Sequence, residues 1–121
     1  MIGETVPVSI TPEQKAVCAR FHAEPHVADP NSKVGMGGSD EGVIHGLRQP
    51  PEGDTTGWYI WRGEYSESGD FFEPLHTWHL ADRLPEVLPY LALPPGWRFL
   101  LAPDCEDVWY DDSLLKVESP K

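Results

Sequence analysis

The chain has few cysteines and few basic residues. Its 121 residues include two Cys and nine Lys or Arg, against twenty Asp or Glu, which gives a formal net charge of −11. Two cysteines cannot form a disulfide framework, so we expect a cytosolic protein with reduced thiols. The shortage of Lys and Arg argues against binding to nucleic acid or to an anionic membrane surface.

Long apolar runs are also missing. The first residues, "MIGETVPVSI", have no basic start and no long apolar stretch, so we expect no signal peptide. No segment approaches the length of a transmembrane helix. The chain is instead rich in Pro (thirteen), Gly (eleven) and aromatic residues (five Trp, four Tyr and four Phe). This composition predicts one folded unit of short elements joined by many turns.

The pattern of helix and strand signals predicts an α+β fold. Thr11 as N-cap, Pro12 at the first helical position and Gln14 at the capping-box position predict a helix at about residues 12–22. We expect strands at 43–47, 58–62, 96–103 and 106–117, the last two as an antiparallel hairpin, and two helical pieces within 71–96. The result is a mainly antiparallel sheet with helices packed on one face. Residues 1–45 would supply an N-terminal helix and a glycine-rich segment, and residues 46–121 the core of one globular unit.

The strand at 58–62 is aromatic on both of its faces. Trp58 and Ile60 point one way in an extended strand, and Tyr59 and Trp61 point the other. Helices on one face of the sheet would bury one pair, which leaves the second pair to be covered. A loop such as "QPPEGDTTG" is the expected cover, because large exposed apolar patches are unusual on monomers. The alternative is that these rings remain exposed and contact a partner.

Two groups of residues have spacings found in metal sites. Cys18, His22 and His26 repeat every four residues, but Pro25 interrupts the helix that would align them. His76 and His79 lie three residues apart without an HExxH pattern. We expect no metal and no cofactor at either place. No nucleophile elbow and no phosphate-binding loop is present, so the sequence yields no catalytic residue.

Acidic side chains gather in two segments that also carry aromatic residues. The first segment follows the strand at 58–62, and the second is "PDCEDVWYDD"; together they contain Glu64, Glu67, Asp70, Glu73, Asp104, Glu106, Asp107, Asp111 and Asp112. If the strands at 58–62 and 106–117 lie side by side, the two acidic segments merge into one negative surface. The pattern is compatible with a solvated rim that guards a sheet edge and equally with a binding patch.

From residue 46 to residue 115 the chain resembles bacterial immunity protein family 33. The resemblance lies in "GLRQPPEGDTTGWYIWRGE", "DFFEPLHTWHL", "LPEVLPYLALPPGWRFLLAP" and "EDVWYDDSLL". It implies a cytosolic, non-enzymatic protein that binds and neutralises a toxin delivered between competing bacteria by contact-dependent or type VI systems. It supplies no catalytic residues. The recurrent positions of the family are Trp58, Tyr59, Gly63, Glu64, Trp97, Phe99, Asp107, Trp109 and Tyr110.

The leading hypothesis is therefore a binding module for a toxin with a basic surface, because an acidic surface accelerates association with such a partner. Its predicted contact residues are Trp61, Glu64, Glu67, Asp70, Asp107, Trp109, Tyr110, Asp111 and Asp112. A second hypothesis is a structural or regulatory cytosolic domain that forms a homodimer through the aromatic sheet face. A third and less favoured one is a metal-dependent hydrolase built on His76, His79 and nearby acids.

Overall fold

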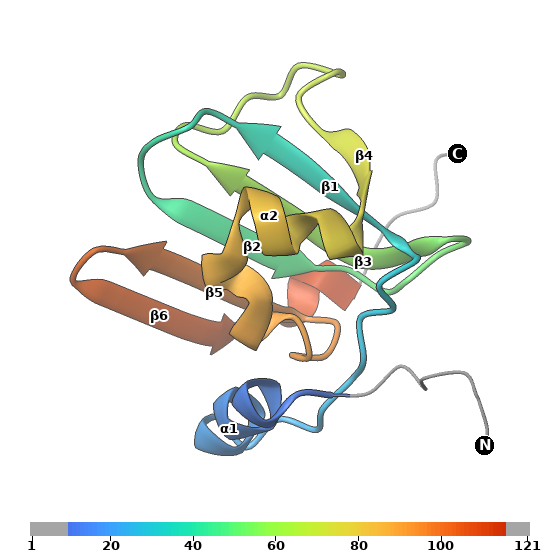
Figure 1. Cartoon of the computed structure of the whole chain (residues 1–121), viewed down its shortest axis with the longest axis vertical. Helices are drawn as coiled ribbons and strands as arrows, with labels where there is room; N and C mark the ends of the chain where they lie inside the picture. The colour runs from blue at the N-terminus through green and yellow to red at the C-terminus, as the bar shows by residue number, and fades with distance from the viewer. Residues whose placement is uncertain (1–9, 116–121) are drawn as a thin grey trace.

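A six-stranded sheet organises the chain in the computed structural model, which describes residues 10–115 (Figure 1). Its strand order is β4-β1-β3-β2-β5-β6. The strand β1 runs parallel to β3, and all other neighbours are antiparallel. The strands are β1 (Lys33–Gly38), β2 (Ile44–Arg48), β3 (Thr55–Arg62), β4 (Glu73–His76), β5 (Trp97–Ala102) and β6 (Cys105–Tyr110). The predicted α+β fold with a mainly antiparallel sheet is confirmed.

The first helix forms where its capping signals place it. In α1 (Pro12–Arg20), the hydroxyl of Thr11 accepts a hydrogen bond from the Gln14 backbone N–H at 3.1 Å. The side-chain oxygen of Gln14 accepts one in return from the Thr11 N–H at 3.0 Å. The helix ends two residues before the predicted limit, and His22 adopts a left-handed φ of 59°. The remaining helical segments are η1 (Thr77–His79), α2 (Leu80–Arg83), η2 (Pro85–Tyr90) and η3 (Asp112–Leu115).

Residues 73–76 are a strand, so the prediction that helix begins at residue 71 is wrong. They form β4, which pairs antiparallel with β1 along the register Val34↔Leu75. The sequence "KVGMGG" of β1 gave no strand signal, because glycine lowers strand propensity. Once β1 pairs with β3, its other side offers unpaired backbone groups, and these hold residues 73–76 extended. Pro74 fits there because β4 is an edge strand.

The hydrophobic core lies between one face of the sheet and the helical segments (Figure 1). Trp58, Ile60 and Phe99 supply its sheet side, and α1, α2 and η2 cover it. The indole N–H of Trp58 donates to the Leu91 carbonyl at 3.0 Å, which satisfies the buried polar atom of that ring. The buried members are Val17, Cys18, Val34, Ile44, Trp58, Ile60, Leu80, Leu84, Val87, Leu91, Ala92, Leu93 and Phe99.

The opposite face of β3 is covered by the protein itself. Its cover is the 63–72 loop, which follows the strand, and not residues 49–57 as expected. The Phe72 ring lies 5.1 Å from the Tyr59 ring, and the Tyr65 ring lies 5.4 Å from the Trp61 ring. Gly35 makes room for this layer, because a Cβ there would lie 2.7 Å from the Tyr59 ring. Trp61 is consequently only 6% exposed.

Candidate functional site

The edge strand β6 carries most of the predicted contact residues of the second acidic segment. Its side chains alternate between the two faces of the sheet. Glu106, Val108 and Tyr110 lie opposite Leu101, Phe99 and Trp97 of β5, on the face that bears the helices. Asp107 and Trp109 lie on the other face. A partner that approaches this edge therefore meets charged and aromatic groups on both faces.

Glu106 is engaged within the protein. Its carboxylate accepts two hydrogen bonds from Arg20 of α1, at 3.0 and 2.6 Å, and a third from the Tyr90 hydroxyl. The hydrogen bonds from Arg20 and then from Tyr90 hold the pKa of Glu106 below its ordinary value. Burial, followed by the bond to this carboxylate, raises the pKa of Tyr90 to about 12. Glu106 thus ties α1 and η2 to the edge strand, which makes it a structural residue.

Asp111 is also committed to internal contacts. Its carboxylate accepts hydrogen bonds from the Ser113 hydroxyl at 2.6 Å and from Arg98 at 3.2 Å. The Ser113 hydroxyl and backbone N–H, ahead of Arg98, lower the pKa of Asp111. The Arg98 guanidinium also lies 5.4 Å from the centre of the Trp109 ring, in cation–π geometry. Among residues 10–115 the Arg98 Nε–H has no hydrogen-bond partner.

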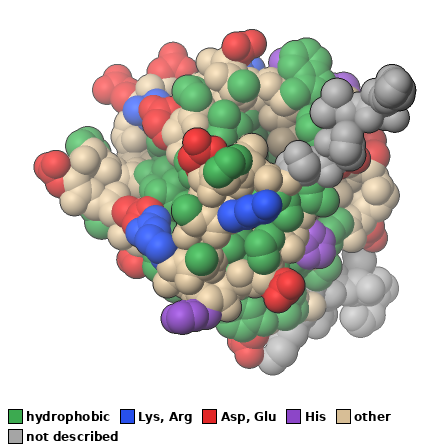
Figure 2. All heavy atoms as spheres, turned by 60° about the horizontal axis from the view of Figure 1, so that its bottom comes forward, with side chains coloured by type: hydrophobic (Ala, Val, Ile, Leu, Met, Phe, Trp, Pro, Cys, Tyr) green, Lys and Arg blue, Asp and Glu red, His purple; other side chains and the backbone are tan. Residues whose placement is uncertain are grey.

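Four predicted residues of this segment remain accessible, and we call them the edge group: Asp107, Trp109, Tyr110 and Asp112. Asp107 and Asp112 are exposed and join no ion pair within the described part of the chain. Tyr110 is 50% exposed, with its ring 5.6 Å from the Trp97 ring, and Trp109 is partly exposed. Figure 2 shows that acidic side chains are interspersed with hydrophobic ones over the face it displays, and do not form a single block.

The other predicted acids lie on the 63–72 loop. Glu64 and Asp70 line a shallow hollow of about 530 Å³, beside Phe71. Glu67 is exposed in the same loop. The strands β3 and β6 are separated by β2 and β5. Three strand spacings amount to about 14 Å, so the acidic segments do not merge through neighbouring strands as envisaged. Trp61 is buried beneath this loop, which removes its ring from any contact surface.

Within the described residues, neither candidate metal group is completed by the fold. Cys18 points into the core, where its thiol lies 3.5 Å from the Ala92 carbonyl and burial raises its pKa. The helix ends before His26, as Pro25 predicted. The His76 and His79 rings lie 6.1 Å apart, and His79 stacks on Trp78. Across residues 10–115, no three His, Cys, Asp or Glu side chains come together as a metal-binding group.

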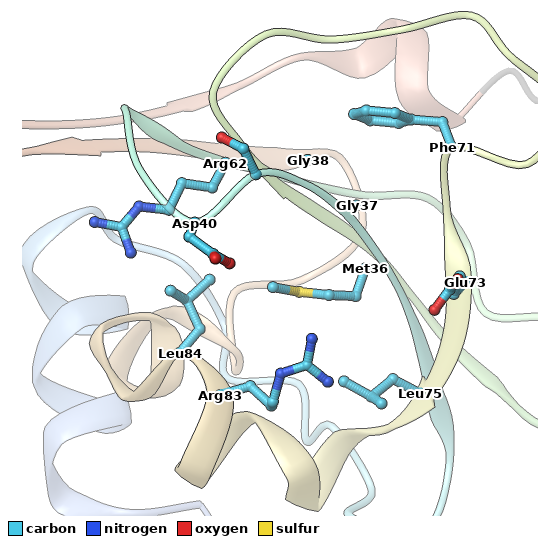
Figure 3. A pocket seen from close by; sticks show the side chains of 11 residues that line it. Met36, Gly37, Gly38, Asp40, Arg62, Phe71, Glu73, Leu75, Arg83 and Leu84 are labelled. Carbon is cyan, nitrogen blue, oxygen red and sulfur yellow. The ribbon is translucent and has the colours of Figure 1, made fainter.

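A cavity that the sequence did not reveal lies between α2 and the β1–β4 pair. It measures about 300 Å³. Figure 3 shows the Arg83 guanidinium and the Asp40 carboxylate entering it from opposite walls, with Met36 between them. No ion pair joins Arg83 to an acid in the described residues. This arrangement can accept a side chain with a charged end. The sequence could not reveal this cavity, because Asp40 and Arg83 come together only through the pairing of β1 with β4, which was not predicted.

Protonation of His45 should destabilise the protein in mild acid. Its ring stacks on Trp61 at 4.8 Å, and burial, followed by the charge of Arg98, lowers its pKa. The unfolded chain therefore binds a proton more readily, near the ordinary His pKa of about 6.5. Stability from this residue is present above that pH and is lost as the pH falls through the folded-state pKa. Urea unfolding between pH 7 and 5 should show a shallower decline for His45→Gln than for the wild type. Parallel declines would contradict this assignment.

Comparison with known proteins gives one family match. The model of the family described as "Imm33-like domain" matches residues 13–111. The match includes α1 and β1, which the sequence resemblance had left out. No curated protein and no solved structure matches the chain significantly. Within residues 10–115, every helix is too short or too polar to cross a bilayer.

Proposed function

The chain belongs to the Imm33-like domain family, and on that premise we propose that it is a non-enzymatic immunity protein that binds and neutralises a cognate bacterial toxin. It would act in the cytoplasm, where a delivered toxin reaches its target. The proposal includes no catalytic step and no cofactor. Neutralisation would come from binding alone, through a surface that blocks the toxin.

The edge group is the observation that carries the proposal. Two exposed carboxylates that join no ion pair within residues 10–115, those of Asp107 and Asp112, flank the accessible rings of Trp109 and Tyr110 on one sheet edge. Acidic groups on a protein of net charge −11 accelerate encounter with a basic partner. Aromatic side chains are the residues that most often slow dissociation at protein interfaces. The edge group combines both properties.

The 63–72 loop offers a second acidic region for the same partner. Glu64 and Asp70 at its hollow could receive a basic side chain, with Glu67 nearby. The strand β3, from which this loop starts, lies about 14 Å from β6, a strand spacing that one standard interface spans. Asp111 has a different role in this scheme, since it holds Arg98 against the ring of Trp109.

Charge reversal tests the edge group. We expect Asp107→Lys combined with Asp112→Lys to lower the association rate with the cognate toxin domain by roughly tenfold or more at low salt. Stopped-flow fluorescence over a range of salt concentrations measures this rate and its salt dependence. The variant should also show a flatter dependence on salt, because fewer opposite charges steer the encounter.

The matched control reverses two other exposed acids, Glu52 and Asp82, and so changes the net charge by the same amount. This control should retain most of the association rate. Equal losses in both variants would show that only total charge matters and would remove the edge group from the proposed surface. Failure of the wild-type protein to bind the toxin domain, or to protect cells that express it, would overturn the proposed function itself.

A further inference from the structure

The two edges of the sheet differ in their capacity to accept another strand. The edge strand β4 has four residues and contains Pro74, which makes it a poor template for pairing. The edge strand β6 has six residues and contains neither Pro nor Lys. Its charged residues, Glu106 and Asp107, are both acidic, so they guard this edge against acidic strands but not against a basic one. Exposed sheet edges are where extended segments of other chains add to a sheet.

The register identifies which backbone groups of β6 are free. The Asp111 N–H donates to the Gly96 carbonyl at 2.7 Å, which extends the β5–β6 ladder by one pair. Hydrogen-bonded and non-hydrogen-bonded pairs alternate in an antiparallel ladder. Asp107 and Trp109 therefore direct their N–H and C=O groups toward β5.

The alternate residues Glu106, Val108 and Tyr110 direct their N–H and C=O groups away from the sheet. Within residues 10–115, no other backbone group forms a hydrogen bond with them on that side. Three alternate residues of β6 thus direct backbone groups outward along this edge. An incoming strand would find a ready ladder of donors and acceptors there.

The side chains beside this ladder specify the chemistry of the incoming strand. On the helix-bearing face, Val108 and Tyr110 present apolar and aromatic surface. On the other face, Asp107 is exposed, and Asp104 and Asp112 stand near the two ends of the strand. A second copy of this chain would set like charges against each other at these positions, which disfavours self-pairing.

We propose that β6 is the pairing edge for an extended segment of a basic partner, whose side chains alternate between Lys or Arg and apolar residues. The basic side chains lie on the face of Asp107, and the apolar ones lie beside Val108 and Tyr110. This inference rests on the proposed function, because the toxin would supply the segment, and it specifies how that partner is held.

Amide hydrogen exchange followed by NMR tests the pairing directly. The probe is a cyclised β-hairpin peptide whose outer strand alternates Lys and Val, and the control hairpin has Glu in place of each Lys. In the free protein, the amides of Glu106, Val108 and Tyr110 should exchange fast, and those of Asp107 and Trp109 slowly. The Lys hairpin at saturation should slow the first three at least tenfold, and the Glu hairpin should not. Binding without this protection, equal effects of both hairpins, or no binding at millimolar peptide would overturn the proposal.

Two variants of Tyr110 separate its backbone from its ring. Tyr110→Ala removes the ring and keeps the N–H, whereas Tyr110→Pro removes both. We expect Tyr110→Pro to bind the Lys hairpin about tenfold more weakly than Tyr110→Ala, the effect of one hydrogen bond. Equal affinities would count against strand pairing. If the Pro variant does not fold, the exchange experiment on the wild type still decides the matter.

The exchange experiment also distinguishes the two proposals. If the toxin domain binds while the amides of Glu106, Val108 and Tyr110 stay fast, the pairing edge is wrong and the immunity function stands. If the Lys hairpin protects the edge but the toxin domain does not bind, the edge is real and the proposed function is wrong.

Discussion

Replacing Arg48 with Met should lower the free energy of unfolding by about 3–5 kcal/mol, a large fraction of the stability of a domain this size. Arg48 is 1% exposed and has no carboxylate partner among the described residues. Its guanidinium instead donates to five backbone carbonyls at 2.9–3.2 Å, those of His26, Val27, Thr56, Leu91 and Leu93. Methionine has no donor to replace these bonds, so buried carbonyls would lose their partners.

The location of Arg48 explains why its loss should affect the whole fold. It extends from β2 and joins the segment after α1 to the segment after η2, with Trp58 stacked 5.6 Å away. Burial lowers the pKa of Arg48 to about 10, so the side chain is still protonated at pH 7. Carbonyl dipoles balance its charge. This balance requires the segments that carry these carbonyls to be in place. The protein thus uses one arginine to hold irregular backbone against the sheet.

Urea unfolding with Arg20→Met as the control tests this role. Arg20 has a 51% exposed side chain in an ion pair with Glu106, so its loss should cost no more than about 1 kcal/mol. Arg48→Lys should fall between the two variants, since an ammonium group keeps the charge but cannot reach carbonyls in five directions. A decrease for Arg48→Met as small as that for Arg20→Met would show that the carbonyl contacts contribute little.

The sequence predicted those elements whose signals are local. The α1 cap depends on Thr11 and Gln14, three residues apart, and the β5–β6 hairpin depends on a tight turn between alternating strands. Both are confirmed. Their pairing partners lie within a few residues, so no knowledge of the rest of the chain was needed.

The sequence failed where long-range pairing overrides local preference. The glycines of β1 disfavour a strand in isolation, yet Gly35 and Gly37 are needed where rings and backbone of the 63–72 loop approach the sheet. The same loop buries Trp61. The alternation of side chains along the strand at 58–62 did not indicate which segment covers that ring. Asp111 resembled its acidic neighbours in sequence, and only the fold shows that it binds Arg98, whereas Asp107 joins no ion pair among the described residues. The edge group is therefore a subset of the predicted contact residues.

Replacing Gly46 with Ala should destabilise the protein by about 2–3 kcal/mol. Gly46 lies in β2, between β3 and β5, opposite Ile60 and Phe99. A Cβ at this position would lie 2.3 Å from Cζ of the Phe99 ring, which no side chain can tolerate without movement. Phe99 is 1% exposed and packs against Trp58 and Tyr90, so its ring has little space to move. The cause is steric, because the φ of Gly46 is not positive.

The double variant Gly46→Ala with Phe99→Leu distinguishes overpacking from a general intolerance of alanine in β2. Leu removes the ring atoms that the new methyl group would contact, so the two substitutions should be coupled, with the double variant more stable than the sum of the single losses by about 1 kcal/mol or more. Additive losses in urea unfolding would contradict the steric explanation.

Toxin binding gives a second readout. Gly46 joins the β5–β6 hairpin to the rest of the sheet, yet it contacts no member of the edge group. A double variant that regains its fold should therefore regain its affinity, whereas Asp107→Lys with Asp112→Lys should stay folded and bind slowly.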